Sequence, residues 1–253
     1  PTVRQDTMLG AYLLHTAQKG YALAASLEAE FAGEAVSLPE NVSAAEVYSM
    51  ALRQRERLHQ RDMESLLWDM EQPLTRVLFE MEDEGFLVDL DTLNQLSDLF
   101  TREIEESRQA VYRLTEVPDF NLNSPKQLGE VLFDKLGLPA QKKNKNGAYS
   151  TAAEELEDLV PYHPCIEPLL RYRKLSKLQS TYVDGLRKLR GRDGRVHTTF
   201  DQTATVTGRI SSMEPNLQNI PIRTDEGREI RRAFVAGEGN ILLDAGYSQI
   251  ELR

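Results

Sequence analysis

The chain has 253 residues and is 40% hydrophobic, which suits one or two domains with apolar cores. Its 30 Lys and Arg residues against 40 Asp and Glu give a formal net charge of −10, which argues against a uniformly basic nucleic-acid binder but leaves room for a local basic track. The single cysteine, Cys165, excludes an internal disulfide framework and favours a reducing cytoplasm. No apolar run reaches the roughly 18 residues of a membrane span, so we expect no membrane partner.

The first 72 residues predict helices. Apolar residues recur at helical spacing at Met8, Leu9, Tyr12 and Leu13, and a second helix is expected from about Tyr21. The stretch 43–69 predicts one long charged helix, with its inner face formed by Leu52, Leu58, Leu66 and Leu67. Plain helical packing is the simplest interpretation of this part of the chain.

Residues 73–118 predict two further helices joined by a short extended link. Gly85 suits the end of the first helix, and Asp89 or Asp91 suits the N-cap of the second. Acidic residues crowd positions 80–84, where a solvated helix face is a simpler interpretation than a metal cluster.

Residues 119–164 begin with a clear helix start, because Ser124 is a good N-cap and Pro125 suits the first helical position. A lysine-rich loop follows over 141–150, and lysines in such a loop usually only increase solubility. Thr151 and Glu154 then have the spacing of a capping box for another helix.

A concentration of positive charge follows at residues 171–195. Two acids, Asp184 and Asp193, lie among nine basic residues, which gives a local balance of +7 in a chain of −10. Arg173 and Lys177 are four residues apart and share a face if the segment is helical. A charged, solvent-facing helix is the alternative to nucleic-acid contact. The nine basic residues are Arg171, Arg173, Lys174, Lys177, Arg187, Lys188, Arg190, Arg192 and Arg195.

The last fifth of the chain combines short hydrogen-bonding side chains with a buried-strand pattern. Alternation at 196–200 predicts a strand that leads into TATVTGRISSMEPNLQNIP, where Gly208 allows close backbone approach beside Arg209. Such groups grip sugar and phosphate or reach groove edges, although a polar surface loop fits equally well. Ile241–Leu243 then predict a buried strand that ends in a polar cluster within YSQIELR.

The strings TATVTGRISSMEPNLQNIP and YSQIELR resemble the A family of DNA polymerases, the bacterial DNA polymerase I family. The resemblance implies an α+β, helix-dominated fold. Residues 1–72 would be the C-terminal part of an inactive 3′–5′ exonuclease-like domain. Residues 73–199 would be the thumb-bearing start of the polymerase domain. Residues 200–253 would form the first antiparallel strands of a palm, truncated after YSQIELR.

The resemblance also implies which residues contact DNA. The thumb would lie over duplex phosphates, and the TGR–SS–PNLQN segment would lie along the primer-template. Arg209 would reach minor-groove acceptors that all base pairs share. The implied DNA-binding residues are Lys142, Lys143, Ser150, Arg173, Lys177, Gln202, Thr205, Arg209, Asn216, Gln218 and Asn219.

Two departures from the family pattern predict that this chain alone is inactive. Gly246 occupies the position of the family's metal-binding Asp, and nearby Asp244 is a poor substitute. Glu251 matches the residue that excludes ribonucleotides. The chain starts at Pro1 and stops at Arg253, before the family's later catalytic elements, so we expect a fragment. The family uses Mg²⁺, held by carboxylates, and we expect no metal on this chain.

The missing exonuclease motif supports the same expectation. A Tyr and an Asp four residues apart should lie near 43–51, where the chain reads SAAEVYSMA and has no such pair. The resulting hypothesis is part of a DNA-directed DNA polymerase of the bacterial nucleoid, a monomer that binds primer-template DNA. Deoxynucleotides would bind only an intact parent.

Two other interpretations remain open. The first is a non-catalytic DNA-binding module derived from a polymerase, or one half of a split polymerase that lacks its C-terminal half. The second is a helical interaction protein with no nucleic-acid role, which would make the resemblance accidental.

Overall fold

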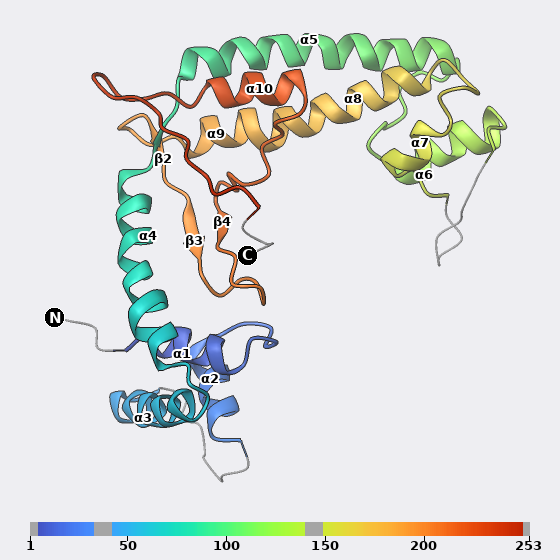
Figure 1. Cartoon of the computed structure of the whole chain (residues 1–253). Helices are drawn as coiled ribbons and strands as arrows, with labels where there is room; N and C mark the ends of the chain where they lie inside the picture. The colour runs from blue at the N-terminus through green and yellow to red at the C-terminus, as the bar shows by residue number, and fades with distance from the viewer. Residues whose placement is uncertain (1–4, 33–41, 140–148, 250–253) are drawn as a thin grey trace. The chain divides into compact units, whose positions relative to one another are not determined.

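The computed structural model describes residues 5–32, 42–139 and 149–249. These residues form two compact units (Figure 1). The first comprises the described residues of Pro1–Phe86 and Arg195–Asn219, and the second those of Leu87–Gly194 and Ile220–Arg253. The chain thus enters each unit twice.

Three helices pack against one another at the start of the first unit, beside an apolar core drawn mainly from the first of them. α1 (Thr7–Leu14) is capped by Asp6 and packs with α2 (Leu23–Glu30) and α3 (Ala44–Gln60). A capping box between Ser43 and Glu46 begins α3. The core includes Leu9, Tyr12, Leu13, Leu58 and Leu67.

The long helix expected over 43–69 is wrong in its extent. α3 ends at Gln60, and Asp62 has a φ of 54°, which an α-helix cannot accommodate. A π-helical turn, η1 (Leu66–Glu71), then begins and continues into α4 (Gln72–Glu84). Leu58 and Leu67 are buried as expected, whereas Leu52 lies six residues before Leu58, on another side of α3, and is 51% exposed. Gly85, with a φ of 61°, ends α4 as predicted.

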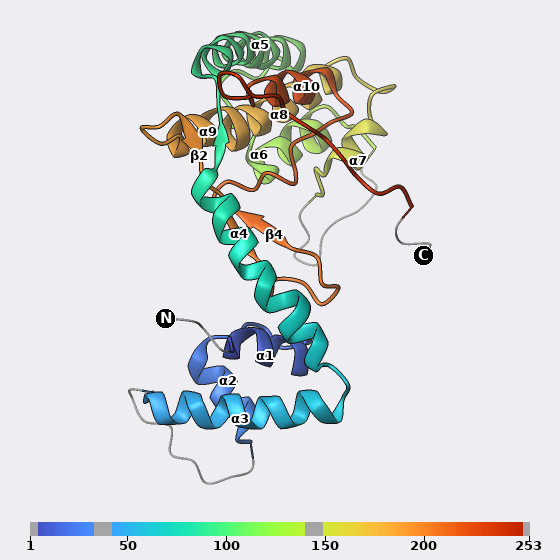
Figure 2. The ribbon, with the colours of Figure 1, turned by 60° about the vertical axis from the view of Figure 1, so that its left-hand side comes forward.

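The second unit is built on two long helices that lie side by side (Figures 1 and 2). α5 (Leu90–Thr115) begins at Asp89, whose side chain accepts from the Thr92 backbone N–H, and it packs along α8 (Ile166–Leu178). The hydrogen bond from the Thr92 hydroxyl lowers the pKa of Asp89. The path of α8 continues through η3 (Gln179–Val183) into α9 (Asp184–Leu189). α10 (Asp225–Arg232) packs against α5.

Shorter elements close one end of the second unit. Ser124 caps α6 (Pro125–Gly129) as predicted, and η2 (Glu130–Lys135) follows it. α7 (Ala153–Glu157) starts after Ala152 without a side-chain cap, so the predicted capping box is absent. The N-cap position is Ala152, one residue after Thr151, and the Thr151 hydroxyl accepts a hydrogen bond from Arg173. The shared core includes Val111, Leu128, Leu132, Leu156, Cys165 and Leu169.

The described strands are short and form small sheets. β3 (Thr199–Asp201) and β4 (Ser211–Met213) pair antiparallel, with Phe200 opposite Ser212. β1 (Phe86–Leu87) pairs with β2 (Arg195–Val196). The prediction of a helix-dominated fold with antiparallel strands is therefore confirmed at this level.

The buried strand expected at Ile241–Leu243 is wrong. Residues 241–249 form no strand, and Ile241 and Leu243 are 86% and 85% exposed. A strand needs a neighbour for its backbone N–H and C=O groups, and no described segment pairs with this one. The apolar pattern alone therefore could not place it.

Candidate nucleic-acid interface

Gln202 fastens the end of β3 to the start of α4 within the first unit. Its amide nitrogen donates to the backbone oxygen and to Oε2 of Glu71, at 3.0 Å each. Its amide oxygen accepts from Thr75 Oγ1 at 3.0 Å, and the residue is only 9% exposed. The side chain that sequence analysis assigned to DNA contact is thus held by neighbours in its own chain.

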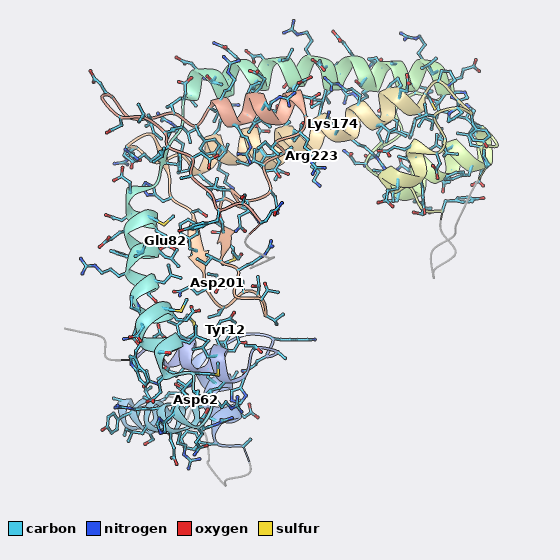
Figure 3. The ribbon with its side chains drawn as sticks, in the orientation of Figure 1. Tyr12, Asp62, Glu82, Lys174, Asp201 and Arg223 are labelled. Atoms are coloured by element: carbon cyan, nitrogen blue, oxygen red, sulfur yellow. The ribbon has the colours of Figure 1, made fainter. Side chains whose placement is uncertain are left out.

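The turn after β3 is held from α1. The Tyr12 hydroxyl donates to the Thr205 carbonyl at 2.8 Å, and Figure 3 shows Tyr12 close to the Asp201 end of β3. Thr205 Oγ1 donates to the Arg209 carbonyl at 2.9 Å, which closes the turn. Gly208 has a φ of 77°, which a residue with a side chain rarely adopts. The turn therefore presents Arg209, whose side chain is exposed, on a braced backbone.

Side-chain amides also brace the loop after β4. Gln218 Nε2 donates to the Ile210 carbonyl at 2.6 Å, while its Oε1 accepts from the Ser212 backbone N–H at 3.3 Å. Asn216 Oδ1 accepts from the Gln218 backbone N–H at 3.0 Å. Asn216, Gln218 and Asn219 are nevertheless exposed. The loop thus combines internal bracing with amide groups at the surface.

The second unit holds the other predicted contacts. Arg173 and Lys177 both lie on α8, as expected. The Arg173 guanidinium donates to the carbonyls of Thr151 and Leu122, and burial lowers its pKa. Lys177 is exposed, and Ser150 Oγ accepts from the Ala152 backbone N–H at 3.5 Å. Lys142, Lys143 and Glu251 lie outside the described residues.

Acids from distant parts of the chain offset the positive charge of α8. Arg171 pairs with Glu103 of α5 and Glu226 of α10, and Lys174 Nζ lies 2.8 Å from Glu226 Oε2. The sequence balance of +7 counted only acids within 171–195, so it overstates the local charge. Glu226 is a functional candidate that sequence analysis missed, and no spacing signal links it to residues about 50 positions earlier.

The basic residues also do not form one continuous set. Arg195 belongs to the first unit, where it pairs with Glu84 at 2.9 Å, whereas the eight others lie in the second unit. Arg187 lies 3.7 Å from Asp184, and Arg190 Nε donates to the Val88 carbonyl at 3.0 Å. Several of these side chains therefore have structural partners.

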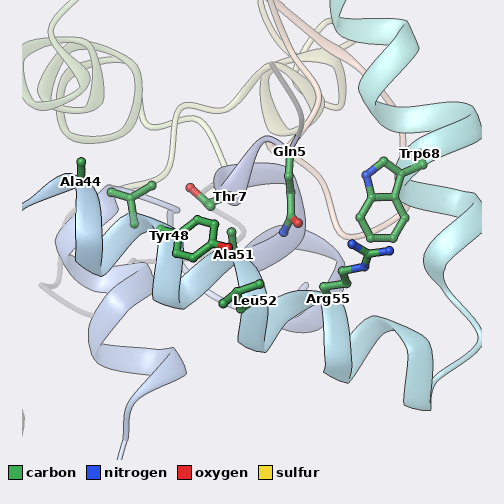
Figure 4. Close-up of a pocket in the computed structure, with 9 residues that line it drawn as sticks. Gln5, Thr7, Ala44, Tyr48, Ala51, Leu52, Arg55 and Trp68 are labelled. Carbon is green, nitrogen blue, oxygen red and sulfur yellow. The ribbon is translucent and has the colours of Figure 1, made fainter. Parts of the chain in front are cut away.

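A groove on α3 lies where the exonuclease motif was sought. Figure 4 shows Ala44, Tyr48, Ala51 and Leu52 along α3, with Arg55 over the Trp68 ring. None of the nine residues that line this groove carries a carboxylate. Its lining therefore offers no carboxylate of the kind that holds the metal ions of two-metal nucleases.

The described residues contain no group of three or more His, Cys, Asp or Glu side chains arranged to hold a metal ion. Gly246 and Asp244 are both exposed, with open space where a side chain at Gly246 would begin. Within the same described ranges, no helix is long and apolar enough to cross a membrane.

The chain matches the model of DNA polymerase family A over residues 90–253, and it therefore belongs to this family. Among its relatives, DNA polymerase I of Geobacillus stearothermophilus is 44% identical over 270 residues, covering 98% of this chain and 31% of the relative. The thermostable DNA polymerase I of Thermus filiformis is 52% identical over 215 residues, covering 83% and 26%. The chain thus spans less than a third of the length of these relatives.

A solved structure gives the same result. The POL domain of Pol1 from M. smegmatis, in complex with DNA primer-template and dNTP, matches with a TM-score of 0.84 and 44% identity. The match covers 92% of this chain and 41% of that one. The interpretation as a helical protein unrelated to polymerases is therefore wrong.

Proposed function

We propose that this chain is part of a DNA-directed DNA polymerase that serves replication and repair, and that it binds primer-template DNA. The observation that carries the proposal is the family match over residues 90–253, which includes the TGR–SS–PNLQN segment. Because the relatives are bacterial, we place the protein at the bacterial nucleoid in this proposal. The partner is a primer-template duplex, in keeping with the complex of the M. smegmatis neighbour.

The three segments take distinct roles in this proposal. Residues 1–72 are the C-terminal part of an exonuclease-like domain without activity, which agrees with a groove on α3 that lacks carboxylates. Residues 73–199 carry the thumb, and residues 200–253 begin the palm. Apart from Thr199, the antiparallel pair β3–β4 belongs to this last segment.

The predicted DNA-binding residues divide into contact and support roles. Arg209, Asn216 and Asn219 are exposed and supply donors for the minor groove and the sugar-phosphate backbone. Gln202 and Thr205, with most of their polar atoms bonded inside the chain, hold these donors in place; Gln218 does both. Lys142, Lys143, Ser150, Arg173 and Lys177 serve the thumb, and Lys177 is an exposed cation of α8.

We also propose that this chain of 253 residues is catalytically inactive by itself. Transfer with two Mg²⁺ ions needs carboxylates that hold the ions about 3.5–4 Å apart. Glycine at 246 supplies no ligand, and among the described residues no carboxylate cluster replaces it. The residues present therefore do not fit the metal, and we assign no chemical step to this chain. Glu251 keeps its proposed role of excluding ribonucleotides in an intact parent.

A second candidate is one half of a split polymerase. It is favoured by the extended segment 241–249, where Ile241 and Leu243 expose their apolar side chains. A partner chain that supplies neighbouring strands would bury them and would complete the palm. Deoxynucleotides would then bind the assembled pair.

A primer-extension assay with Mg²⁺ and four deoxynucleotides tests the proposed inactivity. We expect no product from the chain alone, and restored extension after addition of a separately produced remainder of a family A polymerase domain would favour the split arrangement. Extension by the purified chain alone would show that the assignment of Gly246 as a lost ligand is wrong.

A further inference from the structure

Three basic residues on one side of α8 line a groove beside α7. Arg171, Lys174 and Lys177 follow one another at intervals of three residues, so they occupy neighbouring positions on the helix surface. They form one wall of a groove of about 670 Å³ in the second unit. We call these three residues the α8 cation row. In the proposed function, Lys177 of this row serves the thumb.

Glu226 forms ion pairs with two of the three residues of the row. Its Oε2 lies 2.8 Å from Lys174 Nζ, and its Oε1 accepts from Arg171 Nη1. The Glu226 side chain is only 13% exposed, whereas the side chains of Arg171 and Lys174 are 38% and 42% exposed. The carboxylate therefore lies beneath the two cations, and they remain open to solvent on their outer side.

The start of α10 fixes this carboxylate in place. Thr224 Oγ1 accepts from the Gly227 backbone N–H, which caps the helix one residue before its first acid. Gly227 lies so close to Pro221 that an added Cβ would come within 2.3 Å of the Pro221 carbonyl oxygen. Glu226, between these two fixed points, has little freedom to move away from α8.

The carboxylate is also charged at neutral pH. Burial opposes its ionisation, but hydrogen bonds from Lys174, from its own backbone N–H and from Arg171 outweigh burial and lower its pKa to about 2. A phosphate that approaches Lys174 or Arg171 therefore meets a competing anion at neutral pH. A carboxylate and a phosphate both accept from the same ammonium and guanidinium donors.

We propose that Glu226 competes with DNA phosphate for Arg171 and Lys174. By pairing with these two residues, Glu226 lowers the affinity of the α8 cation row for duplex DNA. The inference rests on the proposed DNA binding. It adds a residue that limits the affinity of the chain for DNA. A lower affinity favours release of the duplex and movement of the protein along it. Lys177, which Glu226 does not contact, remains the row's freely available cation.

The Glu226→Gln variant tests the competition. Binding of a fluorescent primer-template is measured by anisotropy over a series of salt concentrations. Loss of the carboxylate is expected to tighten binding about fivefold at low salt, which corresponds to about 1 kcal/mol for one unit charge removed at about 4 Å in water. The log–log salt slope should steepen by about 0.9, which is the value for one further phosphate contact.

The Glu229→Gln variant is the matched control. Glu229 is on the same helix and pairs with Arg232 at 3.0 Å, so the variant makes the same charge change and also breaks an ion pair. It should leave the salt slope unchanged. An equal gain in both variants would mean that overall charge, rather than competition for the row, sets the affinity, and would overturn the inference.

The Lys174→Gln variant gives a second test that does not require Glu226→Gln to fold. Lys174 is partly exposed, and because Glu226 already holds it, its replacement should change the wild-type salt slope by less than about 0.5. In the Glu226→Gln background the same replacement should abolish the gain in affinity. A wild-type slope that Lys174→Gln reduces by about 0.9, or weaker binding by Glu226→Gln, would contradict the competition. Absence of any wild-type binding would instead refute the proposed function.

Discussion

At the scale of single residues, several polar side chains of the candidate interface stabilise the fold, although their residue types are those that contact nucleic acid. Gln202 and Arg173 carry the chemistry of nucleic-acid contact, yet both are bonded to the protein's own backbone. Their loss would leave buried polar partners without hydrogen bonds, which costs about 1–3 kcal/mol for each group. Effects of such variants on DNA binding therefore need a parallel measurement of stability.

Glu226 makes a pH-dependent contribution to stability. Its pKa falls from an ordinary value of 4.5 to about 2 on folding, so its contribution is complete above about pH 5 and is lost as the pH falls towards 2. We expect the loss to reach at most about 3 kcal/mol. Denaturant unfolding at several pH values should show a smaller decrease in the free energy of unfolding for Glu226→Gln than for the wild type. Parallel curves for the two proteins would refute the assigned pKa shift.

At the scale of elements, local chemistry predicted where helices begin, but non-local contacts decided the rest. Ser43, Asp89 and Ser124 act as N-caps because a short side-chain oxygen reaches the first-turn N–H groups without help from distant residues. The run Ile241–Leu243 has strand chemistry but no described neighbour to pair with. The break at Asp62 has no glycine or proline to signal it.

The α10 helix depends on one close approach. In Gly227→Ala the added methyl would meet the Pro221 carbonyl oxygen at 2.3 Å, and backbone atoms cannot move aside cheaply. We expect a loss of about 2 kcal/mol in the free energy of unfolding, as for overpacked cores.

Gly185→Ala on α9 is the matched control for this position. Its nearest neighbour would be the Ser180 carbonyl oxygen at 3.8 Å, an ordinary contact. Since alanine favours a helix more than glycine does, we expect a gain of about 0.5–1 kcal/mol. Denaturant melts of both variants should shift in opposite directions, and equal shifts would argue against the tight packing of α10.

At the scale of the whole molecule, the motif strings predicted the family, and the family model and the relatives agree. The charge of the candidate interface could not be predicted in the same way. Counting charges along residues 171–195 yields +7, whereas folding brings Glu103 and Glu226 to Arg171 and places Arg195 in the other unit. The local charge of the surface depends on which acidic residues from distant parts of the chain the fold brings close. The spacing of residues in the sequence does not identify these acids.

The most direct test of DNA binding is a titration of labelled primer-template with the chain at two or more salt concentrations. We expect binding that weakens as salt rises, with a log–log slope of about −2 to −4 for a few phosphate contacts at the exposed cations. Arg209→Ala should weaken binding further, because it removes an exposed donor, and a parallel denaturant melt separates this loss from any change in stability. Absent binding, or binding that salt does not change, would contradict the assignment of this chain as a primer-template-binding part of a polymerase.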